Sequence, residues 1–131
     1  MSDISSNYKI FYRLWLTNAD GKSILGDGKI RLLNKIQEEK SLSSAAAALG
    51  MSYRKAWGDI KKAEETLGFE LTIKARGGNK GGGSCLSPKG KQLIQAYTEL
   101  HNDMKSSVDA AYGKFNQTIE NLPEEGEDEG C

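Results

Sequence analysis

The chain of 131 residues is poor in the residues that define several classes of protein. It has two cysteines, Cys85 and Cys131, too few for the disulfide framework of a small secreted domain. One histidine and two distant cysteines give no spacing typical of a zinc site. No apolar run approaches the roughly 18 residues of a membrane span, and no signal-peptide pattern follows Met1. We therefore expect a cytoplasmic protein with free thiols and without metal, cofactor or membrane association.

The chain also lacks the patterns of the common catalytic sites. The glycine-rich segment 77–83 fits neither the phosphate-binding P-loop nor the dinucleotide-binding motif. His101 lies off the apolar stripe of its segment, and Glu64 and Glu65 stand beside lysines, which indicates solvated side chains. Nothing assembles a nucleophile, a base and an oxyanion site. We expect that the protein is not an enzyme.

Charge is balanced over the whole chain but unevenly distributed. There are 18 basic and 18 acidic residues, and five of the acids lie in residues 123–131, where there is no base. Residues 51–91 alone carry nine bases against four acids. Such an excess indicates either a polyanionic partner or a lysine-rich solvated surface.

The first regular element is expected to be a strand. Apolar residues alternate from Tyr8 to Thr17, and Asn18–Gly21 is typical of a turn, after which residues 23–25 can pair back. Phe11 and Trp15 lie on the less apolar face of this strand. They are either covered within their own domain or contact a second copy of the chain.

Three helices are predicted next, over residues 28–40, 45–49 and 53–67. Ser43 or Ser44 is expected to cap the second helix and Ser52 the third, while Gly50 and Gly68 end them. The last two helices fit a helix-turn-helix unit, although any helical domain can contain such a corner.

A hairpin and a long helix complete the pattern. Residues 69–74 and 84–86 are predicted as two short strands around a basic, glycine-rich tip, the hairpin called a wing. From Pro88 to about residue 116 a helix is expected, with an apolar stripe that a second copy covers or that folds back on its own core. The fold class is mostly α with a small β component. It is a winged helix-turn-helix with an N-terminal strand and a long C-terminal dimerisation helix.

The expected domains are the winged helix-turn-helix over residues 1–87, the dimerisation helix over 88–116, and an acidic, disordered tail over 117–131. The tail serves solubility or imitates DNA on the basic face. The residues expected at a homodimer interface are apolar: Phe11, Trp15, Leu93, Tyr97, Leu100, Met104, Val108, Ala111 and Phe115.

Two motifs carry a family resemblance. Residues 52–57 read Ser-Tyr-Arg-Lys-Ala-Trp, and a glycine-rich segment over 77–83 precedes Leu86, Ser87 and Gly90. With these motifs, residues 27 to about 100 resemble the N-terminal DNA-binding region of the ModE-type molybdate-responsive regulators, relatives of the LysR-type winged helix. The resemblance implies a homodimer that binds double-stranded DNA. The molybdate sites of that family lie in C-terminal domains, for which this chain has no sequence, so we expect no molybdate-binding domain here.

We therefore expect a sequence-specific transcriptional regulator whose 53–67 helix enters the major groove. Arg54 and Lys55 are the expected base readers, and Tyr53 meets a phosphate or a thymine methyl. Trp57 either meets a base or packs beneath the helix, and packing is favoured. The remaining candidates for DNA contact are the helix cap Ser52 and the phosphate-binding bases Lys61, Lys62, Lys74, Arg76 and Lys80. A winged-helix module that binds protein rather than DNA is the alternative.

Overall fold

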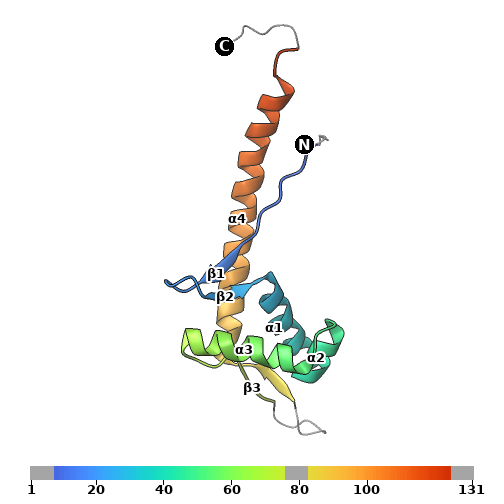
Figure 1. Cartoon of the computed structure of the whole chain (residues 1–131), viewed down its shortest axis with the longest axis vertical. Coiled ribbons are helices and arrows are strands. Elements are labelled where there is room, and N and C mark those ends of the chain that lie inside the picture. Colours follow the sequence, from blue (N-terminus) through green and yellow to red (C-terminus); the bar gives the residue numbers. More distant parts are fainter. Residues whose placement is uncertain (1–7, 76–82, 125–131) are drawn as a thin grey trace. The chain divides into compact units, whose positions relative to one another are not determined.

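A computed structural model describes residues 8–75 and 83–124. The chain forms two compact units, one over Arg13–Glu99 and the other combining Met1–Tyr12 with Leu100–Cys131. The elements in chain order are β1 (Trp15–Thr17), β2 (Ser23–Gly26), α1 (Asp27–Glu39), α2 (Leu42–Ala48), α3 (Tyr53–Leu67), β3 (Thr72–Lys74), β4 (Ser84–Leu86) and α4 (Pro88–Glu120), as Figure 1 shows. Three helices, a hairpin and a long helix follow one another as the winged helix-turn-helix prediction requires, so the predicted fold class is confirmed.

The helix boundaries follow from capping side chains. The Ser52 hydroxyl accepts a hydrogen bond from the Lys55 backbone N–H at 3.1 Å and so starts α3, as predicted. Gly50 and Gly68 both have positive φ and follow α2 and α3, also as predicted. The predicted cap of α2 was wrong: Ser41, not Ser43 or Ser44, accepts from the Ser44 N–H at 3.0 Å. Helix α2 therefore begins three residues earlier than expected.

The N-terminal strand is shorter than predicted. β1 pairs antiparallel with β2, with Leu16 opposite Leu25, so the predicted return strand is confirmed. Residues 8–14, however, are not strand, and the prediction for them was wrong. The reason is the short partner: β2 ends at Gly26 and α1 begins at Asp27, which leaves the earlier residues without a strand to pair with.

The wing hairpin is also shorter than predicted at its start. β3 pairs with β4, and Ile73 lies opposite Cys85. Residues 69–71 were predicted as strand but lie outside β3, and one backbone bond, from the Ser87 N–H to the Leu71 carbonyl at 2.8 Å, joins side-chain bonds in holding them. The Leu71 N–H donates to the Glu64 carboxylate, and the Ser87 hydroxyl donates to the Glu70 carbonyl at 2.7 Å. The Glu64 carboxylate thus takes the Leu71 N–H, and the regular strand pairing begins only at Thr72.

One hydrophobic core holds the Arg13–Glu99 unit together. Its fully buried large side chains are Leu25, Leu32, Leu33, Ile36 and Leu71. α1 packs on α2 and on β4, while α3 packs on α2 and β2. α4 closes the core at its first turn, where a Cβ added to Gly90 would collide with the carbonyl oxygen of Leu71. The compact unit thus includes the first twelve residues of α4, and the expected boundary at residue 87 falls inside it.

Two predicted dimer-interface residues lie in this core instead of on an open surface. Tyr97 is 6% exposed, and its hydroxyl lies 3.2 Å from both the Leu14 carbonyl and the Asp27 carboxylate. Leu93 is partly buried against the same cluster. Their burial is explained within the Arg13–Glu99 unit, which leaves Tyr97 little surface for a second chain.

The second unit contains the rest of α4, from Leu100 to Glu120. The predicted stripe residues Leu100, Met104 and Phe115 are each more than a third exposed there. Ala111 is exposed and Val108 half-buried. None of the described helices is long and apolar enough to cross a membrane.

Candidate nucleic-acid interface

Helix α3 presents an exposed face with most of the predicted DNA-binding residues. Its buried side chains are Ala56, Ile60, Ala63 and Glu64. Tyr53, Arg54, Trp57, Lys61 and Lys62 are all exposed. Gly58 lies among them, and a Cβ added there would meet nothing within 4 Å. The helix therefore offers basic and aromatic side chains around a short stretch of bare backbone.

Trp57 does not pack beneath the helix, so the favoured prediction for it was wrong. Its side chain is 48% exposed, and the Lys61 ammonium lies 5.6 Å from the centre of its ring. The reason is its position on the helix, because Ala56 and Ile60 fill the core-facing side. An exposed indole beside a cation can stack on a flat ligand group as well as contact a cation.

Two of the predicted DNA-binding lysines are paired within α3. The Lys55 ammonium lies 3.0 Å from the Asp59 carboxylate, and the Lys61 ammonium lies 3.3 Å from that of Glu64. Arg54 makes no hydrogen bond or ion pair with any described residue. Its guanidinium is therefore the α3 base-reading candidate that needs to break no contact in order to meet a ligand.

Glu64 is a structural residue that the sequence interpretation missed. It was expected to be solvated, yet it is 9% exposed, and that prediction was wrong. Its carboxylate accepts hydrogen bonds from the N–H groups of Leu71 at 2.8 Å and Thr72 at 3.3 Å. The available signal was its spacing of four residues from Ile60, which puts both on the core-facing side. Glu64 thereby ties α3 to the start of the wing.

The wing carries an exposed lysine. Lys74 ends β3 and is exposed, as a phosphate contact requires. The hairpin is anchored to the end of α1, because the Ser84 N–H donates to the Lys40 carbonyl at 3.0 Å. Arg76 and Lys80, the other predicted wing contacts, lie outside the described residues.

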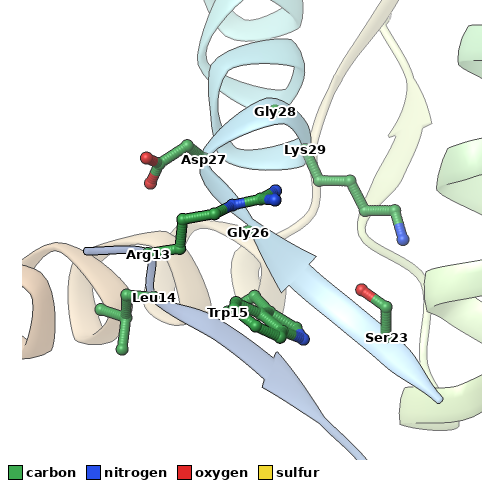
Figure 2. A pocket seen from close by; sticks show the side chains of 8 residues that line it. All are labelled: Arg13, Leu14, Trp15, Ser23, Gly26, Asp27, Gly28 and Lys29. Carbon is green, nitrogen blue, oxygen red and sulfur yellow. The ribbon is translucent and has the colours of Figure 1, made fainter. Parts of the chain in front are cut away.

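A pocket of about 330 Å³ opens at the start of α1 (Figure 2). Figure 2 shows the Arg13 side chain reaching over Gly26 toward the start of this helix. Its guanidinium carbon lies 5.5 Å from the Trp15 ring centre. Lys29 lines the same pocket, and its pKa is lowered, first by burial and then by the charges of Lys62 and Lys55, while Asp59 raises it. The pocket at the start of α1 is thus lined by two basic side chains, those of Arg13 and Lys29.

Within residues 8–75 and 83–124 no group of three or more histidine, cysteine, aspartate or glutamate side chains is placed to hold a metal ion.

The central part of the chain is similar to known bacterial regulators. The model of the bacterial regulatory helix-turn-helix protein, lysR family, matches residues 28–91. The molybdenum transport protein ModE of Azotobacter vinelandii is 30% identical over 100 residues, which are 76% of this chain and 37% of that protein. The DNA-binding transcriptional dual regulator ModE of Escherichia coli K12 is 35% identical over 81 residues, 62% of this chain and 31% of that one. The chain thus spans about a third of the length of these relatives.

A solved structure has the same fold. The DNA-binding domain of CbnR, crystallised with DNA, superposes with a TM-score of 0.54 at 16% identity, covering 69% of this chain and 98% of that domain. Full-length CbnR in complex with its target DNA gives 0.52. Residues 28–91 of the chain therefore match the model of the bacterial regulatory helix-turn-helix proteins of the lysR family, and the chain is similar to part of the ModE-type regulators, as the sequence motifs predicted.

Proposed function

We propose that the protein is a sequence-specific, DNA-binding transcriptional regulator that acts as a homodimer in the cytoplasm. The observation that carries the proposal is the exposed face of α3, where Arg54, which has no hydrogen bond or ion pair with the described residues, stands near Trp57 and bare Gly58. The ModE protein of Escherichia coli, which is 35% identical to this chain over 81 residues, is named a DNA-binding transcriptional dual regulator. No catalytic role is part of the proposal.

In this proposal α3 lies in the major groove and Arg54 reads a base. A guanidinium donates two parallel hydrogen bonds to guanine O6 and N7, which the other bases do not accept in the same geometry. Tyr53 and Trp57, one turn apart and about half exposed, lie on one side of Arg54 and meet a thymine methyl or the sugar-phosphate strand. Lys55 reads a base only after it leaves Asp59.

The phosphate contacts come from lysines at the edge of this face and from the wing. Lys62 and Lys74 are exposed, and Arg76 and Lys80 are proposed to extend the contacts along the glycine-rich tip. Such contacts position the protein on the duplex without reading sequence. Lys61 joins them when its ammonium exchanges Glu64 for a phosphate.

The dimer is proposed to form through exposed apolar side chains of the N-terminal segment and α4. Phe11 is 86% exposed, and Trp15, Leu100 and Phe115 are each more than 40% exposed. A second copy that covers them removes apolar surface from water, at roughly 25 cal/mol per Å². Two recognition helices then meet half-sites about 34 Å apart on one face of the DNA.

The base-reading role is tested with Arg54→Ala, with Lys91→Ala as the charge-matched control on exposed α4 surface. Bound duplexes are first selected from random DNA, and affinities for the selected and a scrambled duplex are then compared by fluorescence anisotropy. Arg54→Ala is expected to cost about 1–3 kcal/mol on the selected duplex and much less on the scrambled one. An equal loss on both would refute base reading, and absence of any duplex binding by the wild type would favour the protein-binding alternative.

The dimer is tested by light scattering of the wild type and of Met104→Glu, which puts a charge into the exposed stripe of α4. The wild type is expected at twice the monomer mass, and the variant is expected to shift toward the monomer. A monomeric wild type at micromolar concentration would contradict this part of the proposal.

A further inference from the structure

A basic groove runs along α3 on the side away from the wing. One part of it lies between α3 and the β1–β2 hairpin and is lined by Lys22, Ser23, Lys29, Asp59, Lys62, Glu65 and Thr66. The adjoining part lies between α3 and the start of α1 and is lined by Gly28, Lys29, Arg31, Leu49, Met51, Lys55 and Asp59. We call the two parts together the α1–α3 groove. Lys29 and Asp59 line both parts, so the two parts adjoin.

The groove carries an excess of positive charge. Five cationic side chains face two anionic ones, and one of these, Asp59, is already bound by Lys55. Burial lowers the pKa of Lys29, Asp59 raises it, and the charges of Lys62 and Lys55 lower it with smaller effects. The excess of positive charge in the lining would attract an anion to the groove. Ser23 and Thr66 add hydroxyl groups to the lining.

The groove and the wing lie on opposite flanks of α3. Successive helical residues are separated by about 100° around the axis, so Glu64 and Lys62 are about 160° apart. Glu64 bonds to the backbone at the start of β3, whereas Lys62 lines the groove beside the β1–β2 hairpin. Figure 1 draws α3 between the β1–β2 hairpin and β3. A hairpin therefore lies on each side of the helix.

The β1–β2 hairpin presents its lysine from an ordered turn. The Asn18 side chain accepts hydrogen bonds from the N–H groups of Asp20 at 3.0 Å and Lys22 at 2.8 Å. Gly21 closes the turn with a φ of 87°. The backbone of Lys22, which lines the groove, is thus held in place by its own hairpin.

We infer that the α1–α3 groove binds the DNA strand on the flank of the recognition helix opposite the wing, with phosphates contacted by Lys22, Lys29 and Lys62. The inference rests on the proposed function. A helix in a major groove about 12 Å wide has a sugar-phosphate strand on each side, and the wing faces only one of them. The β1–β2 hairpin acts as a second basic arm for the other strand. The expected ligand is the backbone of duplex DNA, independent of base sequence.

The test measures the salt dependence of binding to a 30-base-pair duplex of random sequence by fluorescence anisotropy, with the full chain. Lys22→Gln and Lys29→Gln each remove one charge but keep most of the side-chain stem, so neither is expected to unfold the protein. The matched control is Lys35→Gln, on the same helix as Lys29 but paired with Glu38 at 3.0 Å and outside the groove. Circular dichroism checks that all variants are folded.

Each groove variant is expected to reduce the slope of log affinity against log salt by about one, and the double variant by about two. Loss of affinity should be equal for selected and scrambled duplexes. A double variant that matches Lys35→Gln in slope and affinity would refute DNA binding by the α1–α3 groove and leave the role of Arg54 intact. A wild type that binds no duplex would refute both DNA binding by the groove and the proposed function.

Discussion

Glu64→Ala is expected to destabilise the protein strongly, whereas Glu65→Ala is expected to change its stability little. The buried Glu64 carboxylate accepts from Leu71 N–H at 2.8 Å, a bond that contributes about 1.5–3 kcal/mol because the acceptor is charged. The Thr72 bond at 3.3 Å is weaker. The ion pair with Lys61, whose side chain is 46% exposed, adds at most about 1 kcal/mol. The expected loss is about 2–4 kcal/mol.

Urea and thermal unfolding followed by far-ultraviolet circular dichroism measure this loss. For a unit of this size it corresponds to a fall in Tm of about 10–20 °C. Glu65→Ala, at an exposed position of the same helix, is the control and is expected within about 0.5 kcal/mol of the wild type. Glu64→Gln retains one acceptor and is expected to lie between the two. Equal unfolding midpoints for Glu64→Ala and Glu65→Ala would refute the role assigned to this carboxylate.

Two further substitutions separate structure from binding. Gly58→Ala is expected to raise the free energy of unfolding by about 0.5–1 kcal/mol, because an added methyl meets nothing within 4 Å. It is also expected to weaken duplex binding, because that methyl lies on the proposed reading face. A variant with higher stability and also higher affinity for the duplex would contradict the placement of Gly58 on that face. Tyr97→Phe is expected to cost about 1 kcal/mol at neutral pH through its lost hydrogen bonds. Burial, and next the hydrogen bond to Asp27, raise the pKa of Tyr97, so the unfolded chain ionises first and wild-type stability falls as the pH rises past about 10. The difference between wild type and Tyr97→Phe should therefore narrow above that pH, and a constant difference between pH 8 and 11 would show that Tyr97 is not responsible.

Local signals predicted the helices well because each one acts within a few residues. Helix α3 begins after Ser52 and ends before Gly68, where the capping rules place its two ends. The same rules were ambiguous at α2, where three nearby serines compete for one cap. Ser41 is used, and Leu42, in the first turn that follows, packs against the core. Local sequence preference thus limits which residues can cap a helix, and packing against the core determines which of them does.

The strands were predicted less well because a strand depends on a partner elsewhere in the chain. The alternation from Tyr8 to Thr17 is real, yet only Trp15–Thr17 faces β2. In the wing, Leu71 continues the apolar alternation, but its N–H is bonded to Glu64, seven residues earlier, instead of to a strand. Alternation reports which side chains can share a face and says nothing about the length of the neighbouring strand.

The candidate site was predicted in its residues but not in its electrostatics. Counting bases along α3 suggests four equivalent cations, Arg54, Lys55, Lys61 and Lys62. The structure divides them, because Lys55 and Lys61 are held by Asp59 and Glu64 one turn away. The sequence contains these spacings of three and four residues, which allow an ion pair but do not determine whether it forms.

This division assigns different tasks to the basic residues of α3. An exposed ion pair contributes at most about 1 kcal/mol, so Lys55 can exchange Asp59 for a phosphate at little cost, and the exchange is favoured at low salt. Such a lysine contributes to affinity in a salt-dependent way and discriminates little between bases. Arg54 has no competing acceptor among the described residues, and its guanidinium matches the two acceptors of guanine. Specificity should therefore concentrate at Arg54, whereas the lysines around it, including those of the α1–α3 groove, determine how strongly binding responds to salt.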